Sequence, residues 1–177
     1  MRLAGNTLYA GGNFTQVDGV ARDRVAAIDL PTRTLAPFDP GADGEVRVIS
    51  IFNDTMMIGG AFGTLAGQSR NHLGAFNLNN GNLLAFDPSL NNPVLAIGKA
   101  GSQLVLGGQF DQVAATDQRS RLFSLDKSTF QPTAWNPQPN GNVWAIASIF
   151  NDTMMIGGLF TQLNGQPFSR LAKVATT

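Results

Sequence analysis

The side chains that could support chemistry are scarce in this chain. Its 177 residues include one histidine, His72, one glutamate, Glu45, and no cysteine. Nucleophilic catalysis needs a base beside the nucleophile, and a metal site needs a cluster of His, Cys or carboxylate ligands. A glycosidase-type pair of carboxylates would have to be built from aspartates. The sequence therefore predicts a protein without catalytic residues, metal site or cofactor.

The histidine stands in a column of basic residues that recurs along the chain, namely Arg24, His72, Arg121 and Arg170. Such a column could bind an anionic ligand such as a carboxylate. Guanidinium groups that donate hydrogen bonds to the backbone carbonyls of an adjacent turn are the commoner reason for it. His72 is therefore interpreted as a replacement for a structural arginine rather than as a general base.

A second column contains Asp39, Asp87 and Asn136. Calcium needs about six to eight oxygen ligands, which one Asp-Pro or Asn-Pro step does not supply. We therefore expect these residues to form Asx turns.

The elements that position these side chains are set by an internal repeat. The signature Gly-Gly-x-Phe begins at residues 11, 59, 107 and 157, so its spacings are 48, 48 and 50 residues. A closing motif follows in phase, with FDP at 38–40, FDP at 86–88 and WNP at 135–137. A period in the forties is typical of repeat architectures whose units bury their apolar faces against one another.

Each repeat predicts four short strands. In the second repeat they are expected at 46–52, 55–62, 72–78 and 83–86, separated by turns rich in Asn, Asp and Gly. The segment IFNDTMMIGG is identical at 51–60 and 149–158, which indicates duplication. The paired glycines would weaken the second strand unless a neighbouring repeat packs closely against them.

Four antiparallel strands per 48 residues are typical of a β-propeller blade. We therefore predict an all-β propeller with four blades, at about 1–40, 41–88, 89–137 and 138–177, of which the first and last are incomplete. The strand ending in GGxF, a loop such as TQVDGVARDR, a strand such as VAAID and the closing FDP or WNP resemble the bacterial delta-60 type β-propeller repeat. This resemblance covers nearly the whole chain. It implies a tandem-repeat propeller, usually part of a larger surface or secreted bacterial protein, and brings no catalytic residues.

The register of the chain ends predicts how the array is completed. Of the first strand of the first repeat, only the end is present, at residues 1–4. No fourth strand follows the third strand of the last repeat. An incomplete last blade leaves a free edge that another chain can cover. We therefore favour a homodimer that closes a ring of about eight blades over a monomeric four-bladed ring. A fragment of a longer array is a third alternative.

In a propeller, the long loops between strands two and three and those between blades lie on the same face. Loops carry binding residues more often than the scaffold does. The candidate ligand-binding residues on this face are Asp18, Arg22, Arg70, Asp117, Arg119 and Asn164. Trp144, on a strand expected to line the central channel, could stack on a sugar ring, although packing against the channel or a partner chain is the commoner use.

The composition excludes several classes of function. The chain has 12 basic and 12 acidic residues, which argues against a nucleic-acid binder or a polybasic membrane anchor. It shows no signal peptide and no apolar run long enough to insert into a membrane. Its compartment is left open, although the resemblance favours a bacterial surface. We predict a non-enzymatic module that binds protein or carbohydrate, with a self-assembling structural unit as the alternative.

Overall fold

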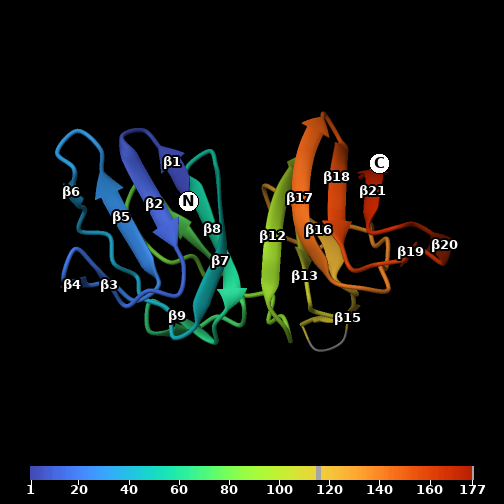
Figure 1. Ribbon diagram of the computed structural model, residues 1–177, viewed down its shortest axis with the longest axis horizontal. Helices are drawn as coiled ribbons and strands as arrows, with labels where there is room; N and C mark the ends of the chain where they lie inside the picture. Colours follow the sequence, from blue (N-terminus) through green and yellow to red (C-terminus); the bar gives the residue numbers. More distant parts are fainter. Residues whose placement is uncertain (115–116, 177) are drawn as a thin grey trace. The chain divides into compact units, whose positions relative to one another are not determined.

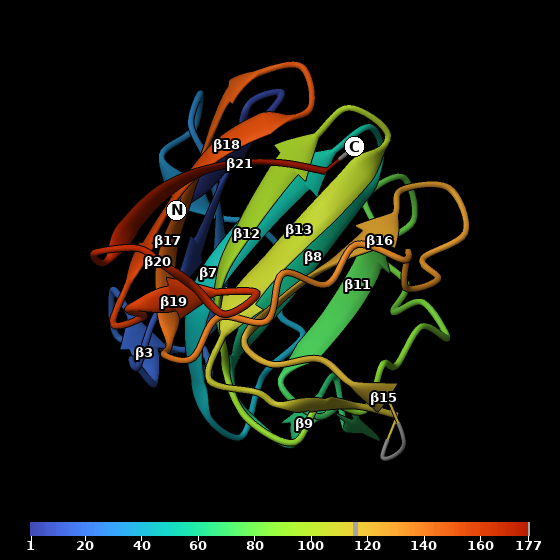
Figure 2. The ribbon, with the colours of Figure 1, turned by 90° about the vertical axis from the view of Figure 1, so that its right-hand side faces the viewer.

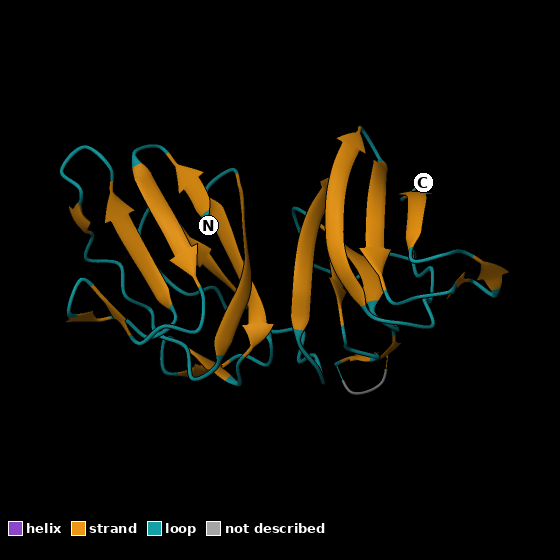
Figure 3. Ribbon diagram, in the orientation of Figure 1, coloured by secondary structure: helices purple, strands orange, loops and turns teal. Residues whose placement is uncertain are grey.

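The computed structural model describes residues 1–114 and 117–176, which form β-strands and turns throughout (Figure 3). The chain divides into an N-terminal half, Met1–Ser89, and a C-terminal half, Leu90–Thr177, and each half contains two of the sequence repeats. No helix in the described ranges is long and apolar enough to cross a membrane. The all-β prediction is confirmed.

The N-terminal half contains the sheets of the first two repeats (Figure 1). The first repeat has the strand order β1-β2-β5-β6, formed by Arg2–Ala4, Thr7–Gly11, Val25–Asp29 and Thr34–Leu35. The second repeat has the order β7-β8-β11, formed by Glu45–Phe52, Thr55–Ala61 and Leu73–Asn77.

The C-terminal half contains the other two sheets, which can be followed in Figure 2. The third repeat has the order β12-β13-β16, formed by Val94–Ala100, Gln103–Gly108 and Leu122–Asp126. The fourth repeat has the order β17-β18-β21, formed by Val143–Phe150, Thr153–Gly158 and Leu171–Ala175. All pairings in the four sheets are antiparallel.

The predicted fourth strand is shorter than expected. Only the first repeat forms it as a strand, β6, and the second and third repeats keep single bridges, Phe76 to Leu83 and Leu125 to Pro132. Pro132 has no N–H to donate to a ladder, and prolines follow closely at Pro37 and Pro88. The prediction of a four-stranded sheet is therefore wrong for the second and third repeats, whose sheets have three strands.

The polar segment between the second and third strands is a small hairpin rather than an open loop. These hairpins are β3–β4 (Gln16–Val17 and Val20–Ala21), β9–β10 (Thr64–Leu65 and Gln68–Ser69), β14–β15 (Gln112–Val113 and Asp117–Gln118) and β19–β20 (Gln162–Leu163 and Gln166–Pro167). In the first repeat, both turn residues have positive φ, 51° at Asp18 and 75° at Gly19. Positive φ at both central positions is the type I′ pattern that suits a two-residue hairpin.

Close approach of the next repeat explains the glycine pairs. In the N-terminal half, a Cβ on Gly11 would overlap the side chain of Val46. In the C-terminal half, a Cβ on Gly107 would lie 2.7 Å from Val143 Cγ1 and 3.1 Å from Ile146 Cδ1. The predicted packing of a neighbouring repeat against the first glycine is therefore confirmed within each half.

Aromatic residues complete the cores. Phe62, Phe110 and Phe160, the last residues of their signatures, are buried. Phe38, from the closing motif of the first repeat, makes edge-on ring contacts with Tyr9 of its own repeat and Phe76 of the next one. The closing aromatic thus joins adjacent repeats, and Trp135 packs in the same way against the core of the fourth repeat.

Candidate functional site

Three of the predicted ligand-binding residues are arginines at the end of the small hairpins. Each donates a hydrogen bond to the backbone carbonyl of the residue 14 positions later. The pairs are Arg22 to Ala36 at 3.4 Å, Arg70 to Leu84 at 2.8 Å and Arg119 to Thr133 at 2.6 Å. These arginines therefore fasten the hairpin of a repeat to the segment that closes the same repeat.

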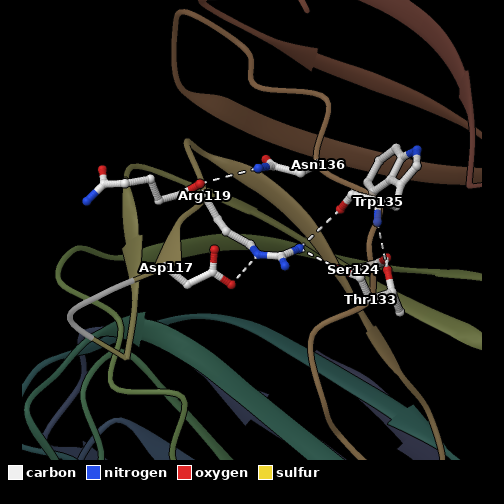
Figure 4. A network of polar contacts seen from close by, with 7 residues as sticks. Asp117, Arg119, Ser124, Thr133, Trp135 and Asn136 are labelled. Atoms are coloured by element: carbon white, nitrogen blue, oxygen red, sulfur yellow. Dashed lines mark hydrogen bonds and ion pairs between the residues drawn. The ribbon is translucent and has the colours of Figure 1, made fainter.

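The third repeat shows this anchor in its most complete form (Figure 4). Asp117 accepts from Arg119 Nε at 2.6 Å, so the carboxylate holds the guanidinium while its Nη1 bonds to Thr133. Asn136 Nδ2 donates to the carbonyl of Gln118 at 3.3 Å. In the first repeat, Asp39 provides the carboxylate that pairs with the arginine, and its Oδ2 lies 3.4 Å from Arg22 Nη1. Most of this polar bonding is internal, which leaves few donors directed at solvent.

The other candidate residues lie apart from this anchor. Asp18 and Asn164 occupy the hairpin turns of the first and fourth repeats, are exposed, and have φ angles of 51° and 47°. Trp144 lies on β17 with 52% of its surface exposed. Among the predicted residues, the structure brings Asp117 and Arg119 into direct contact. The remaining ones are distributed over the first, second and fourth repeats.

The structure explains the column of basic residues as expected. Arg24 Nη1 donates to the carbonyl of Ala42 at 3.1 Å, and Arg121 Nη1 donates to that of Pro139 at 3.4 Å. His72 has the same positive φ as the arginines of the column, 67°, and its backbone bonds to Gly60 and Phe62 of the signature. Burial lowers the pKa of His72, against smaller raising effects of Gly60 and Asp43. These contacts confirm the structural interpretation for Arg24 and Arg121.

A further polar column escaped the sequence analysis. Asp43 Oδ1 accepts from the backbone N–H groups of Gly63 at 2.8 Å and Thr64 at 2.9 Å. Burial raises the pKa of Asp43, but these hydrogen bonds outweigh that effect and hold it below its ordinary value. Asn91 and Asn140 make the same pair of bonds in the third and fourth repeats. The sequence does carry a signal for this column, because an Asp or Asn stands 16 or 17 residues before the second, third and fourth Gly-Gly pairs.

No metal site is formed by the described residues, which contain no group of three or more His, Cys, Asp or Glu side chains suited to hold an ion.

The largest unexplained feature is apolar and lies on the fourth repeat. Phe150 is 72% exposed, whereas Phe52, which has the same place in the duplicated segment, is 7% exposed. Gly157 meets no side chain within 4 Å, unlike its counterparts Gly11 and Gly107. Leu171, which pairs with Gly157, is 59% exposed. We call this surface, formed by Phe150, Gly157 and Leu171, the trailing face of the fourth repeat.

A matching surface lies at the start of the first repeat. Met1 and Leu3 are exposed, and Leu8, the pairing partner of Leu3, is only partly buried. The counterparts of Met1 and Leu8 in the second repeat are Ile49 and Met56, which are buried. We call this surface, formed by Met1, Leu3 and Leu8, the leading face of the first repeat.

Comparison with known proteins identifies the fold. No family model matches the sequence, and no curated protein matches it. The computationally designed Ika4 protein aligns over 99% of this chain and 88% of its own, with 13% identity and a TM-score of 0.65. The computationally designed Ika8 protein aligns over 99% of this chain and 44% of its own, with 14% identity and a TM-score of 0.60. The fold is β-propeller-like.

The propeller-like fold gives the two exposed faces a common explanation. Within each half, the trailing face of one repeat packs against the leading face of the next, as Gly11 does against Val46. The trailing face of the fourth repeat and the leading face of the first lack such a cover among the described residues.

Proposed function

We propose that this chain is a non-enzymatic β-propeller module of the delta-60 type whose principal partner is a second copy of itself. Two chains of four blades each would form a ring of about eight blades. The observation that carries this proposal is the difference in exposure between Phe52 and Phe150, which have the same sequence around them. An exposed apolar surface of this kind on a soluble domain marks an interaction site.

The proposed contact joins the trailing face of one copy to the leading face of the other. In a two-fold symmetric ring this junction occurs twice, so that neither face of either copy stays open. Full burial of a large apolar side chain is favourable by about 1.5–3 kcal/mol. Several such side chains, including Phe150, Leu171 and Leu3, are available for each junction.

The comparisons are compatible with two ring sizes. The chain spans 44% of the length of Ika8 and 88% of the length of Ika4, and a likeness of this kind does not select between a two-copy ring and closure within one copy. We favour the two-copy ring because β21 is the edge of its sheet and the described residues place no further strand beside it. Closure within one chain would cover the same two faces without a partner.

Sedimentation equilibrium decides between these assemblies. We expect a mass of two chains at micromolar concentration, against 18.8 kDa for one chain. Leu171→Asp places a carboxylate in the proposed junction and should yield monomers. Val20→Asp is the matched control, because Val20 is also an exposed apolar residue but lies in the β3–β4 hairpin. A wild-type monomer at these concentrations would contradict the proposal.

A ligand at Trp144 is the second candidate function. Its exposed indole is an apolar platform of the kind that stacks on sugar rings, and the equivalent position in the second repeat holds the exposed Arg47. Binding on a glycan array that is lost in Trp144→Ala, with the assembly intact, would support this function. Equal signals for both proteins would exclude it.

A further inference from the structure

The closing segments of the first three repeats share one mode of attachment. They are 34–40, 82–88 and 131–137, with the sequences TLAPFDP, NLLAFDP and QPTAWNP. The third residue of each donates its N–H to a carbonyl of the third strand, to Ala27 at 2.8 Å, Ala75 at 2.8 Å and Ser124 at 2.9 Å. In the second and third repeats, the first residue accepts from the strand, from Asn77 and Asp126, both at 2.9 Å.

The second residue of the segment supplies the apolar contact. Leu83 bridges to Phe76 in the second repeat and packs against the core of the N-terminal half. Leu35 takes the same place opposite Ile28 in the first repeat. A closing segment is thus an extended strand with an apolar side chain at its second position and an aromatic one at its fifth.

The fourth repeat presents the same attachment edge without a segment on it. By register, the carbonyl of Lys173 corresponds to that of Ala75, and the N–H of Ala175 corresponds to that of Asn77. Both lie on β21, which is the edge strand of its sheet in the part of the chain that the structure describes. A groove of about 280 Å³ opens beside them, lined in part by Trp135, Leu163 and Val174.

One residue that lines the groove differs in chemical character from its counterparts in the other repeats. Phe168 occupies the place of Arg22, Arg70 and Arg119, and its ring lines the groove. The wall is therefore apolar where the other repeats have a cation. At about 280 Å³ the groove is smaller than the roughly 300–1,000 Å³ typical of sites for drug-sized molecules. It suits one or two side chains on an extended backbone.

We infer that the edge of β21 and this groove bind an extended segment of a separate polypeptide. The segment pairs antiparallel to β21 in the way of strand addition, in which main-chain bonds give affinity and side-chain pockets give specificity. Its chemistry is that of the three internal segments, with an apolar residue at the second position, an aromatic residue at the fifth and Asp-Pro or Asn-Pro at the end. The apolar residue enters the groove beside Val174.

A peptide titration tests this inference on the intact chain. The Trp144→Phe variant leaves Trp135, in the groove, as the only tryptophan. The blocked peptide Asn-Leu-Leu-Ala-Phe-Asp-Pro, which copies residues 82–88, should shift the Trp135 emission and saturate. Amide hydrogen exchange at Ala175 should slow in the complex, because its N–H then donates to the first residue of the peptide.

The matched control peptide carries proline at its third position. It keeps the apolar and aromatic side chains but lacks the N–H that would donate to Lys173, so it should bind about tenfold more weakly. Phe168→Arg supplies the missing anchor to the carbonyl of the third residue and should tighten binding by about threefold to tenfold. A scrambled peptide of the same composition should not shift the Trp135 emission.

Three results would overturn the inference. The first is an unchanged Trp135 emission at millimolar peptide, and the second is equal binding of the proline and scrambled peptides. The third is protection from exchange that excludes Ala175. The proposed ring also draws on the edge of β21, so the titration is repeated with the Leu171→Asp variant, in which that edge should be free. An absent effect in both proteins counts against the inference.

Discussion

Substitution of two equivalent glycines tests whether a neighbouring repeat determines the packing. Gly107 and Gly157 both begin the signature of their repeat, and both sit in the second strand of the sheet. A methyl group on Gly107 would lie 2.7 Å from Val143 Cγ1 and 3.1 Å from Ile146 Cδ1. A methyl group on Gly157 would meet only the carbonyl oxygen of Arg170, at 3.8 Å, which is ordinary van der Waals contact.

The two alanine variants should therefore differ in sign. Overpacking of a filled core typically costs about 1–3 kcal/mol, so Gly107→Ala should lower the free energy of unfolding by about 2 kcal/mol. Gly157→Ala removes backbone freedom from the unfolded chain without a clash, which stabilises by about 0.4–1 kcal/mol where the backbone permits it. Neither glycine has a positive φ, so alanine is compatible with both backbones.

Urea denaturation followed by circular dichroism measures both effects. For a slope of about 2 kcal/mol per molar urea, Gly107→Ala should move the midpoint down by about 1 M. In the dissociated chain, Gly157→Ala should leave the midpoint unchanged or raise it slightly. At concentrations where the proposed two-copy ring forms it should lower the midpoint, because Gly157 then lies in a junction like that of Gly107 with Val143. The measurement is made at two protein concentrations, so that a contribution of self-association is visible. Equal losses in the two variants would show that the strand, rather than the adjacent repeat, demands glycine.

Substitutions at two further positions test the polar contacts. Asp43→Asn keeps an oxygen that accepts from Gly63 and Thr64, as Asn91 and Asn140 do in their repeats, and should be close to neutral. Asp43→Ala removes both hydrogen bonds from an exposed site and should cost about 0.5–1.5 kcal/mol in urea denaturation. Burial lowers the pKa of His72 in the folded protein, so protonation favours the unfolded chain. The stabilisation is therefore complete above pH 6.5 and should decrease as the pH falls below 6.5 towards the folded-state pKa, and this step should vanish in His72→Arg. A step in the stability profile that persists in His72→Arg would contradict this assignment.

Much of the fold follows from features that are local or periodic in the sequence. The Gly-Gly-x-Phe spacing locates the repeats. Glycine inside a strand indicates that another element packs closely against it, and this correctly predicts the contact between Gly107 and Val143. The hairpin at Asp18-Gly19 was also within reach, because Asp-Gly between apolar residues is a strong turn signal. The polar residues around this turn predict a loop instead, and the prediction of a loop is wrong there.

The contacts of the arginines could not be derived in the same way. The hydrogen bond from Arg119 to Thr133 depends on where the hairpin folds back onto the closing segment, which is a tertiary relation. The sequence alone shows an exposed basic residue in a polar segment, and such a residue suits a ligand as well as a carbonyl oxygen. The missing information was the acceptor, and only the three-dimensional fold supplies it.

The duplicated segment shows that the burial of a residue depends on the surrounding structure as well as on the local sequence. Phe52 and Phe150 belong to identical decapeptides, and both pair across the same turn, with Thr55 and Thr153. The two copies thus keep the same pairing at the turn, although a bulge between Ser148 and Phe150 shifts the register of the fourth repeat, while exposure of the phenylalanine changes from 7% to 72%. No property of the decapeptide can account for this change, because burial depends on what packs against the sheet. The binding capacity proposed for this chain thus resides in the position of a repeat within the array.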